Sequence, residues 1–288
     1  MIVTHGRDAH SVFMPAMLLR SLIVVLFLVP ACTAPSQPSE DPHPIATTLS
    51  TRFSPPAGYV RTPADPSTLA AYLRALPLKP DGSEVHLYNG SLKSRQDVQA
   101  AVIDITVGGT NLQQCADAVM RLRAEYLFNN ERQDDIAFHF TSGFLAEWKR
   151  WRQGERIIVN GNTCVWSRTA HVDASHAEFM RFMEKVFTYA GTLSLSRELT
   201  KATGDVLPGD VFVHGGSPGH AMMVVDVAKN EGGQLVFLLA QSYMPAQQIH
   251  VVNNFIEVRL SPWFELDKGA ELRTPEWTFQ WSERMRWK

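Results

Sequence analysis

Cysteine is scarce in this chain, with three among 288 residues, and no two of them form a CxxC pair. The ten histidines form no HExxH motif and show no other metal-ligand spacing, and no glycine-rich phosphate loop is present. Zinc sites and nucleotide-phosphate sites depend on such spacings. The sequence therefore predicts neither a metal centre nor a cofactor.

Charge of one sign is not concentrated anywhere in the sequence. Lys and Arg number 27 against 29 Asp and Glu, which gives a net charge of −2, and no basic cluster stands out. Proteins that bind nucleic acid present a basic surface to the phosphates. We therefore expect no nucleic-acid partner.

One apolar run, LIVVLFLV at residues 22–29, follows Arg20 and precedes Pro30-Ala31-Cys32. A positive residue, a short apolar region and a small residue at the cleavage site are typical of a secretory signal, and this run is too short to span a bilayer stably. The segment Val29-Pro30-Ala31-Cys32 resembles a bacterial lipobox, which implies cleavage after residue 31 and lipid on Cys32. We expect a lipid-anchored protein on the periplasmic face of a bacterial membrane. The alternative is an uncleaved N-terminal anchor, which also leaves the body outside the cytoplasm.

Residues 32–57 are rich in proline, serine and threonine. Such a composition buries too little apolar surface to offset the entropy of ordering, so we predict a disordered tether. Residues 58–288 suit a single domain. Hydrophobic residues make up 45% of the chain, which is ample for a core.

The periodicity of this body is mixed. Helical spacing is strongest in residues 112–127 and 176–189, the second with a capping box at Ser175. Residues 156–166 predict a hairpin with Asn160-Gly161 at the turn. From residue 207 onward the apolar runs predict strands, namely VFVH, HAMMVVDVA, QLVFLLAQS, IHVV and FIEVRL. The expected fold class is α+β with an antiparallel sheet.

Two segments could carry chemistry. Thr110 and Gln113 offer a capping box before the helix LQQCADAVMRLRAEYLF, which places Cys115 near its N-terminus. The helix dipole there favours a thiolate. The second segment runs from PGDVF at residue 208 to PGHAMMVVD, which begins at Pro218.

Together these segments resemble the NlpC-type cysteine peptidases that trim bacterial cell walls. The resemblance implies a papain-like fold, in which the cysteine-bearing helix packs on a small antiparallel sheet or half-barrel. It also implies that Cys115 is the nucleophile and His220 the base. Since 105 residues (220 − 115) separate the two, residues 130–200 would form an insertion.

The hairpin geometry supplies a third residue. Strands 220–228 and 234–242 are joined by a short turn, so antiparallel pairing would bring His220 beside Gln241 or Ser242. Gln241 can accept a hydrogen bond from the imidazole, whereas Asp226 lies too far along its strand.

The enzyme hypothesis is that the protein hydrolyses amide bonds through a thioester on Cys115. The backbone N–H of Cys115, with the side chain of Gln113 or Gln114, would stabilise the oxyanion. Peptidoglycan stem peptides are the expected substrate. The alternative is an envelope protein that uses the same scaffold to bind without catalysis.

Other fates of these residues remain open. Cys115 could form a disulfide with Cys164 in an oxidising compartment, or be a buried thiol. His214 competes for the role of base, and Asp210 would brace its turn. Aromatic packing is expected for Trp263, Trp277, Trp281 and Trp287, and a glycan platform is the less favoured alternative.

From Gly58 to Arg259 the body is also similar to an uncharacterised bacterial family, the domain of unknown function 4846. The segments that carry this similarity are LRALPLKPDGSEVHLYNG, NLQQCADAVMRLRAEYL, FTYAGTLSLSREL, PGDVFVHGGSPGHAMMVVD and LLAQSYMPAQQIHVV.

Overall fold

The computed structural model describes residues 47–265 and 270–288. The described residues all belong to one compact unit, Pro44–Lys288. The predicted signal peptide, Cys32 and the first part of the predicted tether lie outside the described residues. Within the described ranges, no helix combines the length and the apolar character that crossing a membrane requires.

Regular structure is present before the predicted boundary at Gly58. Helix α1 (Leu49–Arg52) is capped by Thr48, whose hydroxyl accepts a hydrogen bond from the Thr51 N–H. Leu49 is fully buried, and its N–H donates to the Leu76 carbonyl at 3.0 Å. Residues 48–52 thus pack on the domain through a capped helix and one buried leucine.

Six helices and fifteen strands occur in the described ranges. The helices after α1 are α2 (Leu69–Arg74), α3 (Cys115–Asn129), α4 (Trp148–Trp151), α5 (His176–Tyr189) and α6 (Thr192–Glu198). The strands are β1 (Tyr59–Arg61), β2 (Gln99–Val102), β3 (Ala137–His139), β4 (Leu145–Glu147), β5 (Glu155–Asn160), β6 (Thr163–Arg168), β7 (Thr200–Lys201), β8 (Val211–His214), β9 (His220–Asn230), β10 (Leu235–Gln241), β11 (His250–Val252), β12 (Phe264–Glu265), β13 (Glu271–Arg273), β14 (Thr278–Gln280) and β15 (Arg284–Arg286).

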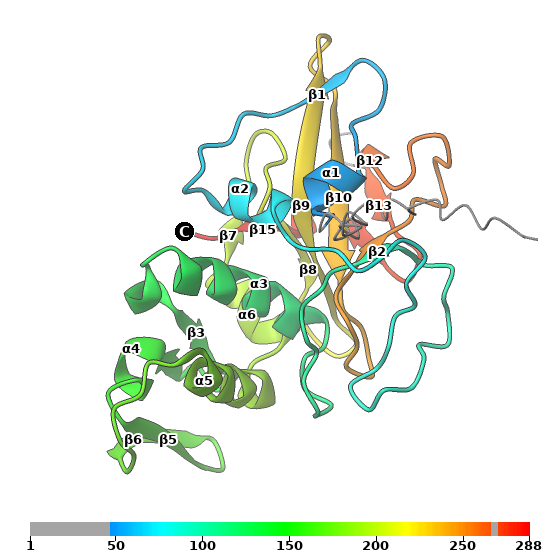
Figure 1. Ribbon diagram of the computed structural model, residues 1–288. Helices are drawn as coiled ribbons and strands as arrows, with labels where there is room; N and C mark the ends of the chain where they lie inside the picture. The colour runs from blue at the N-terminus through cyan, green and yellow to red at the C-terminus, as the bar shows by residue number, and fades with distance from the viewer. Residues whose placement is uncertain (1–46, 266–269) are drawn as a thin grey trace, which may run out of the picture. The chain divides into compact units, whose positions relative to one another are not determined.

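Nine strands form one sheet in the order β2-β11-β10-β9-β8-β15-β7, to which β1 adds beside β9 and β12 beside β10. Its long central strands are β9 and β10, which Figure 1 shows side by side. They pair antiparallel from Leu235↔Lys229 to Ala240↔Met223, with a register shift between Leu238 and Leu239. On the other edge of β9, His220 pairs with His214 of β8.

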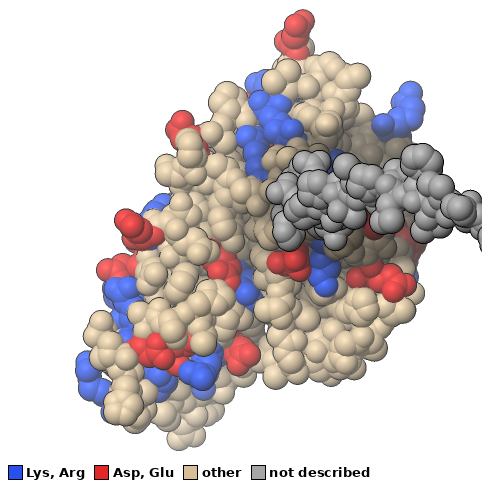
Figure 2. All heavy atoms as spheres, in the orientation of Figure 1, with Lys and Arg blue, Asp and Glu red and all other residues tan. Residues whose placement is uncertain are grey.

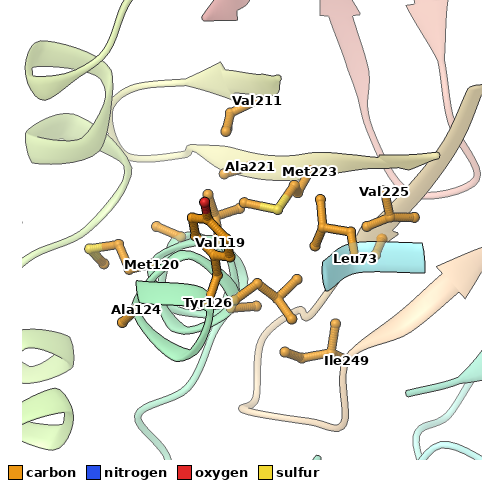
Figure 3. Packing of buried hydrophobic residues seen from close by; sticks show 14 of the residues in the cluster. Leu73, Val119, Met120, Ala124, Tyr126, Val211, Ala221, Met223, Val225 and Ile249 are labelled. Carbon is orange, nitrogen blue, oxygen red and sulfur yellow. The ribbon is translucent and has the colours of Figure 1, made fainter. Parts of the chain in front are cut away.

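Both faces of the sheet are covered, which explains the unbroken apolar run in β9. Ala221, Met223 and Val225 belong to the larger core and face α3, as Figure 3 shows. Met222 and Val224 alternate with them and belong to a second core on the other face, together with Phe237, Phe264, Leu272 and Phe279. A strand covered on both sides loses the alternation of polar and apolar residues.

The region between residues 130 and 200 forms small hairpins and helices of its own. Strands β3–β4 and β5–β6 make two separate two-stranded sheets. Trp148 of α4 packs against Phe179 and Phe182 of α5, with ring centroids 5.8 and 5.7 Å apart. In Figure 1 these elements lie across α3 from the main sheet.

The predicted papain-like fold is wrong. The architecture is a mixed one, with six helices and a nine-stranded, mostly antiparallel sheet instead of a small sheet or half-barrel. Two short motifs suggested the local environment of a cysteine and a histidine, but they contain no information on strand order. That order depends on β2, β7 and β15, which come from distant parts of the chain.

Predictions for single elements had mixed outcomes. Helix α5 begins after Ser175, whose side chain accepts from the Glu178 N–H, and the β5–β6 hairpin forms, so both predictions are confirmed. The predicted cap at Thr110 is wrong: α3 begins after Gln114, whose N–H donates to Asp117 Oδ2 at 2.9 Å. The prediction of a strand for the run FIEVRL is wrong: these residues form bends and turns, and the Leu260 N–H donates to the Glu257 carbonyl at 3.0 Å.

Candidate functional site

A cavity of about 400 Å³ opens between the N-terminus of α3, the α5–α6 connection and the turn before β9. Cys115 and His220 both line this cavity, and so do Gln114, Asp117, Tyr243 and Trp277. The structure thus brings the two residues of the proposed nucleophile–base pair to one concave surface.

Cys115 is the first residue of α3 and is only 7% exposed. Burial raises the pKa of its thiol to about 11, and the nearby Asp117 carboxyl acts in the same direction. Hydrogen bonding from the backbone N–H groups of Ala116 and Ala221 opposes this shift without reversing it. The thiol is therefore neutral at rest, whereas the helix dipole alone had favoured a thiolate.

Asp117 stands one half-turn further along α3 and is 6% exposed. Burial raises the pKa of its carboxyl to about 8, although the Gln114 N–H hydrogen bond lowers it. Its Oδ1 atom has no hydrogen-bond partner among the described residues. A buried carboxyl oxygen without a hydrogen-bond partner lowers the stability of the fold. Such groups at a cavity wall are typical of functional sites.

His220 begins β9 and is 1% exposed. Its ring lies among those of Tyr243, Trp277 and Phe279, with centroids 5.0, 5.5 and 5.8 Å away. Burial lowers the pKa of His220 to about 4, and the hydrogen bond to Gln241 only partly offsets this. The imidazole is therefore neutral at physiological pH and able to accept a proton.

Gln241 holds this imidazole in one tautomer. Its Nε2 group donates to Glu276 Oε2 at 2.6 Å, and a carboxylate can only accept, so the amide orientation is fixed. The Gln241 Oε1 atom then faces His220 Nε2 at 2.8 Å and requires a proton there. Consequently His220 Nδ1 carries the free lone pair.

His250 reinforces the same arrangement from the neighbouring strand, where it pairs with Gln241. Its Nδ1–H donates to the Gln248 carbonyl at 3.0 Å, which leaves its Nε2 to accept from the Gln241 amide at 3.3 Å. Lys93 closes the network by pairing with Glu276 Oε1 at 2.6 Å.

Sequence reasoning missed Glu276, Lys93 and His250. Glu276 lies in the turn between β13 and β14, and Lys93 lies in a loop, so neither has a periodic pattern around it. Gln241 itself was found, although the pairing of Ala240 with Met223 places it diagonal to His220 and not directly opposite. For these three residues the one available signal in the sequence was a histidine, residue 250, within a predicted buried strand.

The two glutamines predicted beside the oxyanion are placed differently. Gln114 lines the cavity, and its Nε2 donates to Asn111 Oδ1 at 3.4 Å. Gln113 is buried and does not line the cavity; its Oε1 accepts from Arg121 at 3.1 Å.

The structure also distinguishes between the alternative roles predicted for individual residues. Cys115 and Cys164 are both free thiols, so the disulfide is absent from the described chain. His214 is half-exposed, pairs with Glu283 at 2.5 Å and does not line the cavity. Asp210 is fully buried between Arg284 and Arg286, at 3.0 and 2.5 Å, which fits a bracing role.

Asp226 is also engaged away from the histidine, in ion pairs with Arg61 and Arg74 at 2.6 Å each. The four C-terminal tryptophans do not form one cluster: Trp277 contacts His220, Trp263 is in the main core and Trp287 lines another cavity. Over the described ranges, no group of three His, Cys, Asp or Glu residues is arranged to hold a metal ion.

Comparison with known proteins identifies one relationship. No curated protein and no solved structure matches the chain. The resemblance to NlpC-type peptidases therefore depends on the sequence segments alone. Residues 49–286, nearly the whole described unit, match the family described as domain of unknown function 4846. The chain belongs to that family.

Proposed function

We propose that this protein is a cysteine-dependent amidohydrolase of the bacterial cell envelope that cleaves amide bonds of peptidoglycan stem peptides. The observation that carries the proposal is that a thiol and a base of defined tautomer line the same cavity: Cys115 and His220 both face it, and His220 Nδ1 has its lone pair free. The similarity of the PGD-to-GHA segment to cell-wall peptidases supports the same chemistry.

The reaction would start from two neutral groups. His220 Nδ1 takes the thiol proton as Cys115 Sγ attacks the amide carbon, and the imidazolium then gives that proton to the leaving amine. A water molecule, deprotonated by the same nitrogen, attacks the thioester and releases a carboxylic acid and the regenerated thiol. Both groups are neutral at rest, because the high pKa of Cys115 and the low pKa of His220 disfavour proton transfer between them before substrate binds.

Two donors are available for the oxyanion. The N–H of Cys115 belongs to the first turn of α3, where backbone N–H groups lack helical partners. The Gln114 side chain reaches the same cavity. These groups would act where negative charge develops on the carbonyl oxygen.

The assignment to the envelope rests on the sequence. The apolar run before Cys32 supports export and lipid attachment, which would hold the domain at a membrane next to peptidoglycan. A tethered hydrolase reaches only substrate within the length of its linker.

Digestion of purified peptidoglycan tests the proposal. The wild-type chain should release new free amino groups, which mass spectrometry would assign to one amide bond, and Cys115→Ala should release none. If both proteins release the same products at the same rate, the nucleophile is not Cys115.

A non-catalytic binding protein is the second candidate, and the burial of Cys115 favours it because a nucleophile must be reached by substrate. In that case both the wild-type chain and Cys115→Ala would co-sediment with peptidoglycan and release nothing.

A further inference from the structure

A second cavity, of about 620 Å³, lies between α3, β3, α6 and the residues that follow β15. It shares no lining residue with the cavity of Cys115. Arg123 lines it from α3, eight residues beyond Cys115, which corresponds to about 12 Å along the helix axis. The two cavities are therefore distinct sites on one helix.

Arg123 is the notable group of this second cavity. Its guanidinium is half-buried between the rings of Tyr126 and Trp287, 5.5 and 5.6 Å from the two centroids. It forms no hydrogen bond or ion pair with any residue of the described ranges. Burial and the neighbouring Arg132 lower the pKa of Arg123, and Tyr126 and Asp135 only partly oppose this shift.

Arg197 of α6 approaches the same cavity and likewise has no acidic partner in the part of the chain that the structure describes. Arg132 is the exception, since it pairs with Asp135 at 2.6 Å. Two guanidinium groups thus face one concavity with their hydrogen-bond donors uncommitted. Guanidinium is the group that best matches a carboxylate, phosphate or sulfonate.

The charge balance of this cavity differs from that of the chain. Four cationic side chains line it (Arg123, Arg132, Arg197 and Lys288) against two acidic side chains (Asp135 and Glu198), an excess of two in side-chain charge. The whole chain has a net charge of −2, and on the face drawn in Figure 2 acidic and basic residues are interspersed. The positive excess is therefore local.

Besides these charged residues and the polar His139, Thr141 and Ser194, the wall has a large apolar part. This part is formed by Leu127, Phe138, Phe140, Leu145 and Trp287. Ligand pockets typically combine such walls with a few polar groups that fix orientation.

We propose that this cavity is a binding site for a small amphipathic anion, whose carboxylate, phosphate or sulfonate head lies between Arg123 and Arg197 and whose apolar body lies against Phe138 and Trp287. The site is independent of the proposed hydrolase chemistry, because it uses none of the residues of the first cavity.

Two fluorescent probes that differ in charge test this site on the full chain. The anion 1-anilinonaphthalene-8-sulfonate should bind saturably at one site, and the neutral N-phenyl-1-naphthylamine should bind at least about tenfold more weakly. Arg123→Gln and Arg197→Gln should each weaken binding of the anion by about tenfold, while Arg123→Lys should retain most of it.

Arg259→Gln is the matched control, since it removes an arginine whose side chain is 89% exposed and outside the cavity, and Cys115→Ala controls for the other cavity. Neither should change the affinity. Because Arg197 is exposed, Arg197→Gln remains informative even if Arg123→Gln unfolds. Equal affinity for the two probes, or loss of anion binding in Cys115→Ala but in neither arginine variant, would overturn the proposal.

Discussion

The reactivity of Cys115 towards a small alkylating agent should reveal a neutral, buried thiol. With a pKa of about 11 the thiolate fraction at pH 8 is about one in a thousand, against roughly one in ten for a thiol at its ordinary pKa of 9.0. Alkylation should therefore be about a hundredfold slower than for an exposed thiol, before any steric effect of burial. Steric hindrance lowers the rate at every pH, so the slope of the pH profile is the more specific quantity.

The assay uses the Cys32→Ser, Cys164→Ser variant, in which Cys115 is the single thiol, with iodoacetamide and intact-protein mass spectrometry. The rate should rise about tenfold per pH unit from pH 7 to pH 10, since only the thiolate reacts. After denaturation in guanidinium the profile should level off near pH 9. His220→Ala should leave the native slope unchanged, because a neutral imidazole does not stabilise a thiolate.

A rate that is already high and independent of pH between 5 and 7 would refute this reasoning. That profile would mean that Cys115 and His220 form a thiolate–imidazolium pair, and that the helix dipole outweighs burial.

Three further predictions concern separate parts of the account. Asp117→Asn should stabilise the protein at pH 8. Between about pH 3.8 and 8 the folded state keeps a proton on Asp117 that the unfolded state has released, so the free energy of unfolding of the wild type falls as pH rises across this window. Urea unfolding should show this fall in the wild type but not in the variant. Gln241→Ala should lower the rate of peptidoglycan hydrolysis on the order of a hundredfold, through loss of the fixed tautomer, with kcat affected more than KM; an unchanged kcat would remove Gln241 from the mechanism. Cys32→Ala should move the protein from the membrane to the soluble fraction on salt-washed fractionation, and persistence with the membrane would disprove the lipid anchor.

The parts of the site that could be predicted from sequence lie in regular elements. Alternation and a short turn place Gln241 near His220, and the helical spacing after Gln114 puts Cys115 at a helix start. Ala240 pairs with Met223, so Gln241 is not directly opposite His220, but a glutamine is long enough to reach this diagonal neighbour.

The parts that could not be predicted depend on burial and on long-range packing. A helix N-terminus gives the sign of one electrostatic effect on Cys115, but the opposing effect of desolvation depends on β9 and on how α3 packs against it. Glu276 reaches Gln241 across 35 residues of sequence from a turn. The strand order could not be predicted for the same reason, since β2, β7 and β15 join the sheet from distant segments of the chain.

Trapping of a thioester with hydroxylamine tests the central claim most directly. During digestion of peptidoglycan, hydroxylamine should compete with water for an acyl group on Cys115, so part of the product should appear as a hydroxamate in the wild type. No product of either kind should form with Cys115→Ala, although that variant should fold and melt as the wild type does. Hydrolysis that yields carboxylic acid alone at every hydroxylamine concentration, or that continues in Cys115→Ala, would contradict the proposed mechanism.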